Sequence, residues 1–446
     1  MPQDDRALNP SGTYIAPDAD PSSQTTIIPH NQQPLVIRSY PSKSQLNKSI
    51  QYAAAAQEKW ARVPLNQRIA IGRKSMEEFS NMRDEIPLEL TLQMDRPISQ
   101  VPGGIRGMLD RADYMLSIAE SALAGVSLAD TDKPGFRRFT KRVPLGVVLV
   151  VAPGSTYPFL VMINSVLPAL IAGNAVIIKP SPQTPLAAER FASGFHTAGV
   201  PRDALQVIHL SPELTTAATK HPLIDFVSFT GSVAGGRAVH IAAAEAPTLK
   251  GVGLELGGKD PAYVRADANL DYTVPELVDG AMFNSGQSCC AVERIYVHES
   301  IYDEFVSRYV ELTKQYRLGD PMKLETTLGP VVSVASADRI RKQALIPGDL
   351  FAAAQPGTAY VAPQVLVDVD HKTFGPVVGI QKVSSDEQAL ALMKDSQRFC
   401  VDELYTGTVF LNRCDYLDPA LAWTGVKNSG RLTRAKSVHM KIKTLP

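Results

Sequence analysis

The sequence has few cysteines, and their spacing fits neither a metal site nor a disulfide framework. Four cysteines occur among 446 residues, and two of them, Cys289 and Cys290, are adjacent. No Cys-x-x-Cys pair is present, so the sequence predicts no metal site of the zinc type. Adjacent cysteines are poor disulfide partners, which favours a reduced, cytoplasmic compartment.

The sequence also lacks net charge. It contains 45 basic and 45 acidic side chains, so we expect no nucleic-acid or membrane partner, because such partners usually require a basic surplus. The polar N-terminus has no apolar signal core. One long apolar stretch, residues 159–178, is interrupted by Pro168, Gly173 and Asn174. It is therefore predicted to be a buried helix and a buried strand rather than a membrane span.

Length and apolar content together predict more than one folding unit. Of the 446 residues, 44% are hydrophobic, and a single core rarely grows beyond about 250–300 residues. Between residues 145 and 256, β-branched runs alternate with helical patterns, which predicts a doubly wound parallel sheet. The predicted strands are 147–151, 175–179, 205–210, 225–231, 292–297, 376–382 and 407–411, and the predicted helices are 43–83, 85–96, 104–125, 159–172, 186–199, 212–220, 274–287 and 300–316.

Two segments carry candidate chemistry. In FNSGQSCC (283–290), Cys289 follows a predicted helix end, and a thiolate beside backbone amides is a good nucleophile. In LELGGKDP (254–261), apolar neighbours would desolvate Glu255, which suits a general base that works near neutral pH. Seen alone, such a cysteine is more often a small buried residue, and such a glutamate is more often solvated or ion-paired.

Together these segments resemble the aldehyde dehydrogenase superfamily. Glu255 and Cys289 are separated by 34 positions, which is similar to the family spacing. The resemblance extends from about residue 34 over nearly the whole chain. Further segments match family motifs in the family's order: AGNAVIIKPSPQTP (172–185), FTGS (229–232), TFGPVVGI (373–380) and WTGVKNSGR (423–431).

The resemblance implies an enzyme that oxidises an aldehyde to a carboxylic acid with a nicotinamide cofactor. Cys289 matches the family nucleophile, and its main-chain N–H would donate to the oxyanion. Cys290 matches a common neighbouring thiol with a structural role. Glu255 matches the base that activates the deacylating water.

The resemblance also implies where the cofactor binds. Lys179 matches a lysine at the adenosine ribose, and Gly231 and Ser232 match the turn under the pyrophosphate. NAD is expected, and NADP is left open because Pro182 replaces a frequent family glutamate. The cofactor-binding set is Val151, Ala152, Pro153, Lys179, Ser181, Gly231, Ser232, Leu256, Gly257 and Phe374, with Phe374 at the nicotinamide ribose.

The implied fold is α/β, with a Rossmann-like cofactor domain, an α/β catalytic domain and a small β oligomerisation arm. The arm implies a homodimer or homotetramer. The expected division is a polar lead-in at 1–33, the cofactor domain at 34–125 and 145–256, the catalytic domain at 257–425, and the arm at 126–144 and 426–446.

Several departures from the family bear on activity. Thr156 stands where the family has the asparagine that is the second oxyanion donor, so Thr156 becomes the candidate donor. Lys372 stands where a glutamate holds the nicotinamide ribose. Four segments are shorter than in the family, near 341–350, 367–372, 395–402 and 429–435. Two alternatives to a dehydrogenase therefore stay open, a catalytically impaired structural subunit and a cofactor-independent esterase.

Overall fold

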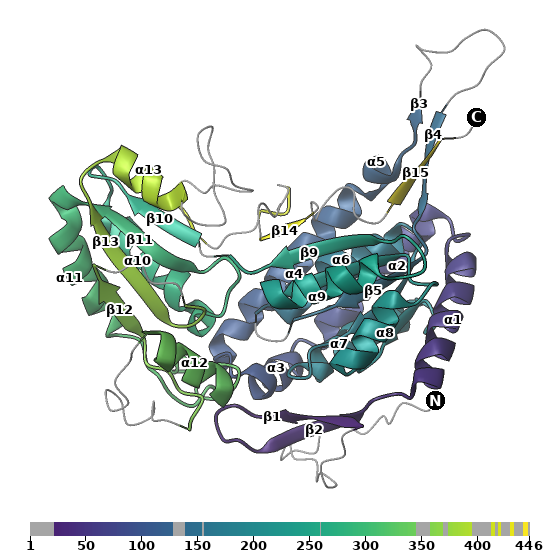
Figure 1. Cartoon of the computed structure of the whole chain (residues 1–446), viewed down its shortest axis with the longest axis horizontal. Helices are drawn as coiled ribbons and strands as arrows, with labels where there is room; N and C mark the ends of the chain where they lie inside the picture. Colours follow the sequence, from purple (N-terminus) through teal and green to yellow (C-terminus); the bar gives the residue numbers. More distant parts are fainter. Residues whose placement is uncertain are drawn as a thin grey trace.

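The computed structural model describes residues 22–127, 139–153, 156–258, 260–344, 357–368, 373–394, 412–414, 418–420, 429–431 and 440–444. Two mainly parallel sheets, each flanked by helices, lie on opposite sides of the molecule (Figure 1). A thin three-stranded ribbon projects from the larger part, and a two-stranded hairpin lies along its lower edge. This arrangement confirms the predicted α/β class.

The larger sheet has six strands in the order β14-β9-β8-β5-β6-β7. The five strands from β9 to β7 are mutually parallel, whereas β14 pairs with β9 in the antiparallel sense. Their bounds are β5 (Val147–Val151), β6 (Ala175–Lys179), β7 (Leu205–Val207), β8 (Phe226–Gly231), β9 (Gly251–Leu256) and β14 (Gly430–Arg431). Every residue of β5 is buried, as expected for a strand covered on both faces.

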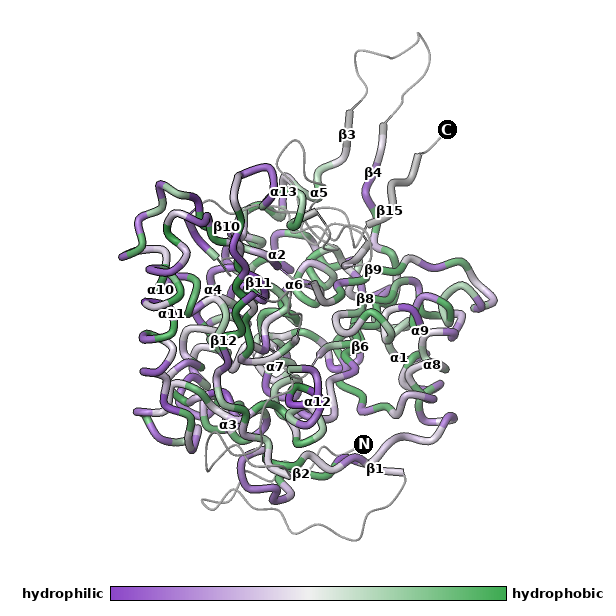
Figure 2. Tube along the Cα trace, turned by 60° about the vertical axis from the view of Figure 1, so that its left-hand side comes forward, coloured by the Kyte–Doolittle hydropathy of each residue, from purple (hydrophilic) through white to green (hydrophobic). Residues whose placement is uncertain are grey.

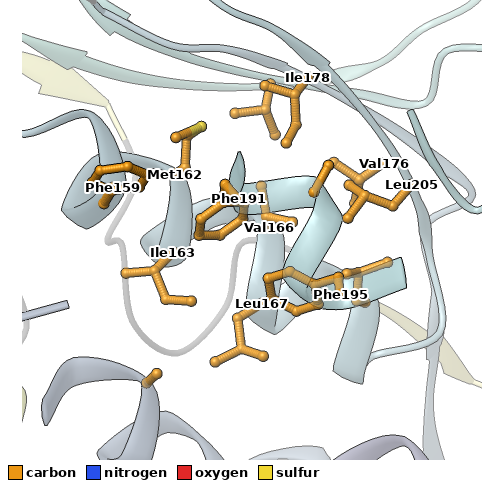
Figure 3. Close-up of a cluster of buried hydrophobic side chains, with 14 of the residues drawn as sticks. Phe159, Met162, Ile163, Val166, Leu167, Val176, Ile178, Phe191, Phe195 and Leu205 are labelled. Atoms are coloured by element: carbon orange, nitrogen blue, oxygen red, sulfur yellow. The ribbon is translucent and has the colours of Figure 1, made fainter. Parts of the chain in front are cut away.

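Alternate residues of these strands enter two separate cores, because successive side chains point to opposite faces. Val148 and Val150 pack with the helices α2, α4, α6 and α7. Val147 and Leu149 pack with α1, α8 and α9 on the other face. Figure 3 shows the first core, in which side chains of α6 and α7 interlock with Val176 and Ile178 of β6. The helices are α1 (Lys43–Trp60), α2 (Leu65–Asn81), α4 (Val101–Ser117), α6 (Pro158–Ile171), α7 (Pro185–Ala198), α8 (Pro212–Lys220) and α9 (Val233–Ala244).

The second sheet has four parallel strands in the order β10-β11-β13-β12. They are β10 (Asp260–Val264), β11 (Val292–His298), β12 (Gln364–Val367) and β13 (Val377–Val383). The helices α10 (Leu270–Met282) and α11 (Tyr302–Thr313) pack against this sheet through an apolar cluster. Figure 2 shows that hydrophobic and hydrophilic residues alternate along the outer helices α10 and α11.

The ribbon and the hairpin use segments distant in sequence. β15 (Met440–Thr444) pairs with β4 (Phe139–Pro144), which also pairs with β3 (Val126–Ser127). β1 (Ser23–Ile27) pairs with β2 (Pro34–Ser39). The Thr26 hydroxyl donates to the carbonyl oxygen of Pro182 at 2.7 Å, which ties the hairpin to the loop after β6. Part of the segment expected to be a polar lead-in is therefore a paired strand.

The remaining differences from the predicted elements have local causes. The helix predicted over 43–83 is broken at Pro64, because proline cannot continue a helix interior. The helix predicted over 104–125 divides at Ile118 into α4 and α5 (Ala119–Leu123), and α3 (Ile86–Met94) ends in left-handed Asp95. Sequence patterns missed β10, β12, α12 (Val334–Ala344) and α13 (Asp386–Lys394), and the strand predicted at 407–411 lies outside the described residues.

No helix in the described part of the chain is both long enough and apolar enough to cross a bilayer. The stretch 159–178 divides into α6 and β6, as predicted. Its helix–strand boundary lies at Gly173, whose φ is +90°.

Candidate active site

The predicted cofactor residues gather at one edge of the six-stranded sheet. Val151, Lys179, Gly231 and Leu256 end β5, β6, β8 and β9. Val151 lies in register with Lys179, and Gly231 lies in register with Leu256. Because parallel strands end on the same side, the residues just after these strands lie at this edge too. They are Ala152, Pro153, Ser181, Ser232 and Gly257. Open α/β sheets bind ligands outside the carboxyl ends of their strands.

The turn from β8 into α9 needs small residues. A Cβ at Gly231 would lie 2.8 Å from the Phe229 ring, and one at Gly235 would lie 2.7 Å from it. Ser232 caps α9, since its hydroxyl accepts from the Gly235 N–H at 3.1 Å. The packing of α9 onto its own strand therefore explains why glycines stand there. This close approach leaves the first turn of the helix at the sheet edge, where an anion is favoured.

Lys179 supplies a positive charge at the same edge. Burial lowers the pKa of its ammonium to about 8. No described carboxylate forms an ion pair with it. Its carbonyl oxygen accepts from the Ala152 N–H at 3.0 Å, which holds the loop after β5 against β6. Ser181 shapes the next turn, in which its hydroxyl accepts from the Gln183 N–H at 3.2 Å.

The loop before the candidate nucleophile is strained and strongly held. The helix predicted over 274–287 ends at Met282, because Asn284, Ser285 and Gly286 have φ values of 53°, 56° and 65°. Non-glycine residues in this region cost of order 1–3 kcal/mol each. The Ser285 hydroxyl donates to the Gly329 carbonyl oxygen at 2.7 Å, and the Gln287 side-chain oxygen accepts from the Val332 N–H at 2.9 Å.

The two adjacent cysteines differ in exposure. Cys289 is half-buried, whereas Cys290 is 4% exposed. The Cys290 thiol and N–H each lie 3.4 Å from the Ser288 hydroxyl oxygen. Cys290 is thus packed into the turn, and Cys289 is the more accessible thiol of the pair.

Arg96 links Thr156 to the loop before Cys289, because it forms hydrogen bonds with both segments. The Thr156 carbonyl oxygen accepts from Arg96 Nη2 at 2.8 Å, and Arg96 Nε donates to Asn284 Oδ1 at 2.9 Å. Thr156 is 8% exposed, and its hydroxyl has no hydrogen-bond partner among the residues that the structure describes. A buried hydroxyl without a partner is costly, so this hydroxyl is a candidate donor to a bound substrate.

Glu255 is 5% exposed and lies one residue before the end of β9. Its chain neighbours Leu254 and Leu256 are also buried, but their side chains point to the opposite face of the sheet. On one side it is in register with Thr230, and on the other with Gly430 of β14. The described end of the WTGVKNSGR motif therefore lies beside Glu255.

Phe374 lies in a loop that touches the Cys289 loop. Phe374 is half-buried, and a Cβ on Gly286 would lie 2.0 Å from the carbonyl oxygen of Gly375. The two loops thus meet backbone to backbone. Lys372 lies outside the described residues, and each of the four shortened segments falls wholly or partly outside them.

Sequence reasoning missed Arg96, Asn284 and Gln100 as parts of the site. Gln100 accepts from the Asn284 N–H at 3.2 Å. Asn284 lies in the FNSGQSCC segment, but no sequence pattern indicated that it contacts Arg96 and Gln100. For Arg96, the available signal was a charged residue between a predicted helix and a proline.

Comparisons with known proteins agree with this geometry. A family model described as "Aldehyde dehydrogenase family" matches residues 15–443. The chain is 30% identical over 403 residues to a probable betaine aldehyde dehydrogenase of Schizosaccharomyces pombe, covering 83% of this chain and 80% of that protein. It is 28% identical to a D-glyceraldehyde dehydrogenase (NADP(+)) of Picrophilus torridus, covering 87% and 82%. The structure is similar to an NAD-dependent aldehyde dehydrogenase from Sinorhizobium meliloti, with a TM-score of 0.89, 25% identity, and coverage of 95% and 91%.

Proposed function

The chain belongs to the aldehyde dehydrogenase family, and we propose that it works through Cys289 as nucleophile and Glu255 as general base. It is an NAD(P)-dependent enzyme that oxidises an aldehyde to a carboxylic acid. The observation that carries the proposed site is the buried Thr156 hydroxyl, which has no hydrogen-bond partner among the described residues. The residue that bears it is linked through Arg96 to the loop before Cys289. This hydroxyl is a hydrogen-bond donor available to a developing charge.

The residues at the sheet edge fit a dinucleotide. The ammonium of Lys179 and the α9 turn of Gly231 and Ser232 would hold its ribose and phosphates. Val151, Ala152, Pro153 and Ser181 line the same edge, and Leu256 and Gly257 continue it next to Glu255. Phe374 would contact the nicotinamide ribose. When bound, the nicotinamide ring supplies a hydride acceptor.

The Cys289 thiolate would first attack the aldehyde carbon, forming a C–S bond and a tetrahedral oxyanion. The main-chain N–H of Cys289 and the Thr156 hydroxyl would each donate a hydrogen bond to that oxygen. Such donors stabilise the transition state most when they are fixed in advance in a dry site, and the held loop and the buried hydroxyl provide both conditions.

Glu255 would act after hydride has left, when the substrate remains on Cys289 as a thioester. Its carboxylate would accept a proton from a water molecule whose oxygen attacks the thioester carbon. The C–S bond then breaks, the acid leaves, and the thiolate is restored. Glu255 is 5% exposed, and this burial keeps competing solvent away from the carboxylate.

The testing experiment follows reduced-nicotinamide absorbance with NAD or NADP and a panel of aldehydes that begins with betaine aldehyde and glyceraldehyde. Cys289→Ser should abolish formation, and Glu255→Gln should block turnover after the first acylation. Thr156→Val should lower kcat by about 10²-fold, as expected when one oxyanion donor is lost. If reduced nicotinamide still formed after Cys289→Ser, the role proposed for Cys289 would be wrong, and unchanged turnover in Glu255→Gln would overturn the role proposed for Glu255.

We also propose that the protein forms a homodimer or homotetramer in the cytoplasm. The support for oligomerisation is the projecting ribbon of β3, β4 and β15. The support for the compartment is chemical, because a thiolate nucleophile must stay reduced, and Cys289, Cys290 and Cys414 form no disulfide within the described part of the chain.

A further inference from the structure

Arg96 connects two segments of the site that are far apart in sequence. It lies between α3 and the short 3-10 helix η1 (Ile98–Gln100) and is 2% exposed. Its Nη2 donates to the carbonyl oxygen of Thr156, 60 positions away, and its Nε donates to Asn284 Oδ1, 188 positions away. One side chain therefore sets the separation between the Thr156 segment and the loop that leads to Cys289.

The guanidinium is held between aromatic rings as well as by hydrogen bonds. Its central carbon lies 4.4 Å from the centre of the Tyr157 ring and 5.9 Å from that of Phe283. Tyr157 follows Thr156, and Phe283 precedes Asn284, so each hydrogen-bonded residue has an aromatic neighbour facing the same cation. A planar fork of donors fixed in this way has a defined orientation, which the flexible ammonium of lysine does not provide.

The backbone of Arg96 is held in place by contacts of the preceding residue, Asp95. Asp95 is left-handed with φ of 55°, is fully buried, and lies 2.8 Å from His30 Nδ1. A Cβ on Gly329 would lie 2.0 Å from the Asp95 carbonyl oxygen, so the two backbones are in direct contact. The same Gly329 accepts from the Ser285 hydroxyl. The anchor of Arg96 and the Cys289 loop thus share a support.

We propose that Arg96 is a positioning residue for aldehyde oxidation, which aligns the Thr156 hydroxyl with the Cys289 thiol. The inference rests on the proposed roles of Thr156 and Cys289. A threonine hydroxyl has a short reach, so its donor position depends on where its backbone is held, and displacements of about 1 Å can cost about 10²-fold in rate. Arg96 holds that backbone by its carbonyl group.

The test is a double-mutant cycle on kcat with Arg96→Met and Thr156→Val. Valine keeps the carbonyl group that Arg96 holds and removes only the hydroxyl. Arg96→Met alone should lower kcat by about 10²-fold. In the Thr156→Val background, the factor by which Arg96→Met lowers kcat should be at least about fivefold smaller. The effects of contacting residues that act together are not additive. The Kd for NAD should stay within about twofold, since the residues at the sheet edge keep their own supports.

A second readout addresses the cysteine directly. The rate of Cys289 alkylation by iodoacetamide, without cofactor, should fall about tenfold in Arg96→Met, because a displaced loop changes thiolate stabilisation. Arg96→Lys should recover part of this rate, since an ammonium can donate to one of the two acceptors. Arg190→Met is the control, because that guanidinium pairs with Glu85 and Glu89 away from the site; its kcat should stay close to that of the unsubstituted enzyme.

An equal cost of Arg96→Met in both Thr156 backgrounds, together with unchanged alkylation, would overturn the inference. If Arg96→Met fails to fold, Arg96→Lys enters the same cycle and gives the same discrimination. Failure of the underlying roles looks different, because reduced nicotinamide would then still form after Cys289→Ser whatever residue occupies position 96.

Discussion

At the residue scale, the strain before Cys289 depends on a glycine. Gly286 has φ of 65°, and a Cβ there would lie 2.0 Å from the Gly375 carbonyl oxygen. Gly286→Ala would have to separate the Cys289 loop from the Phe374 loop. We expect a loss of about 1–3 kcal/mol in the free energy of unfolding and a fall of about 10²-fold in kcat, measured by denaturant unfolding and steady-state kinetics.

Gly199→Ala provides the matched control for this prediction. Gly199 also has positive φ, 114°, but no atom lies within 4 Å of an added Cβ. It ends α7, away from the Cys289 loop. The control should lose stability and keep kcat. If Gly286→Ala also kept kcat, contact between the two loops would be irrelevant to the chemistry.

Also at the residue scale, the charge of Lys179 should make cofactor affinity depend on pH. Burial lowers its pKa to about 8, so its ammonium is mostly charged at about pH 7 and mostly neutral at about pH 9. Affinity should therefore fall as pH rises through this range, more steeply for NADP than for NAD if the ammonium meets a phosphate. Calorimetric titration at both pH values tests this expectation. Lys179→Met should remove the pH dependence, and a slope that persists in that variant would contradict the assignment.

At the element scale, one carboxylate ties three elements together. The carboxylate of Glu189, on α7, accepts hydrogen bonds at 2.8 Å from both Nε and Nη2 of Arg38, on β2. It also lies 2.9 Å from Nε2 of His209, which follows β7. Burial opposes ionisation of this group, but the hydrogen bonds from Arg38 and His209 outweigh burial and lower the pKa of Glu189 to about 2. The ionised carboxylate therefore stabilises the docking of the β1–β2 hairpin.

Glu189→Gln should accordingly lower the free energy of unfolding by about 2 kcal/mol near pH 7, as expected for hydrogen bonds to a charged group. Because the folded pKa is lowered from 4.5 to about 2, the contribution is complete above about pH 4.5 and is lost as pH falls toward 2. The difference in the free energy of unfolding between Glu189→Gln and the unsubstituted protein, measured with urea, should therefore decrease as the pH falls from about 4.5 to about 2. Glu245→Gln is the control, because its pair with Lys220 is exposed and contributes little. A difference that stayed constant with pH would rule out this ion pair as its cause.

At the scale of the whole molecule, the projecting ribbon is separate from the catalytic sheet edge. β15 pairs with β4 from Met440 to Thr444, and removal of residues 440–446 would leave β4 with one unpaired edge. We expect a smaller assembly by sedimentation velocity, while the Kd for NAD stays within about twofold because the sheet edge is intact. An unchanged sedimentation coefficient would show that the ribbon does not mediate assembly.

The sequence by itself determined the local chemistry and the main α/β repeat. Continuous β-branched runs predicted β5 and β6, because a strand covered on both faces needs no polar alternation. Two short motifs that contain Glu255 and Cys289 indicated the family, and the structure bears out the burial expected for Glu255. Motifs and periodicities report interactions within about ten residues of each other, so these features were readable from the chain alone.

Only the tertiary structure decided which distant residues meet. The helix predicted through residue 287 stops at Met282, because contacts from Gly329 and Gln100 stabilise Ser285 and Asn284 in a left-handed conformation that local propensity disfavours. Arg96 reaches Thr156 and Asn284 across separations that follow no period. These contacts form only when separate elements of the fold pack together, so no local sequence pattern could predict them.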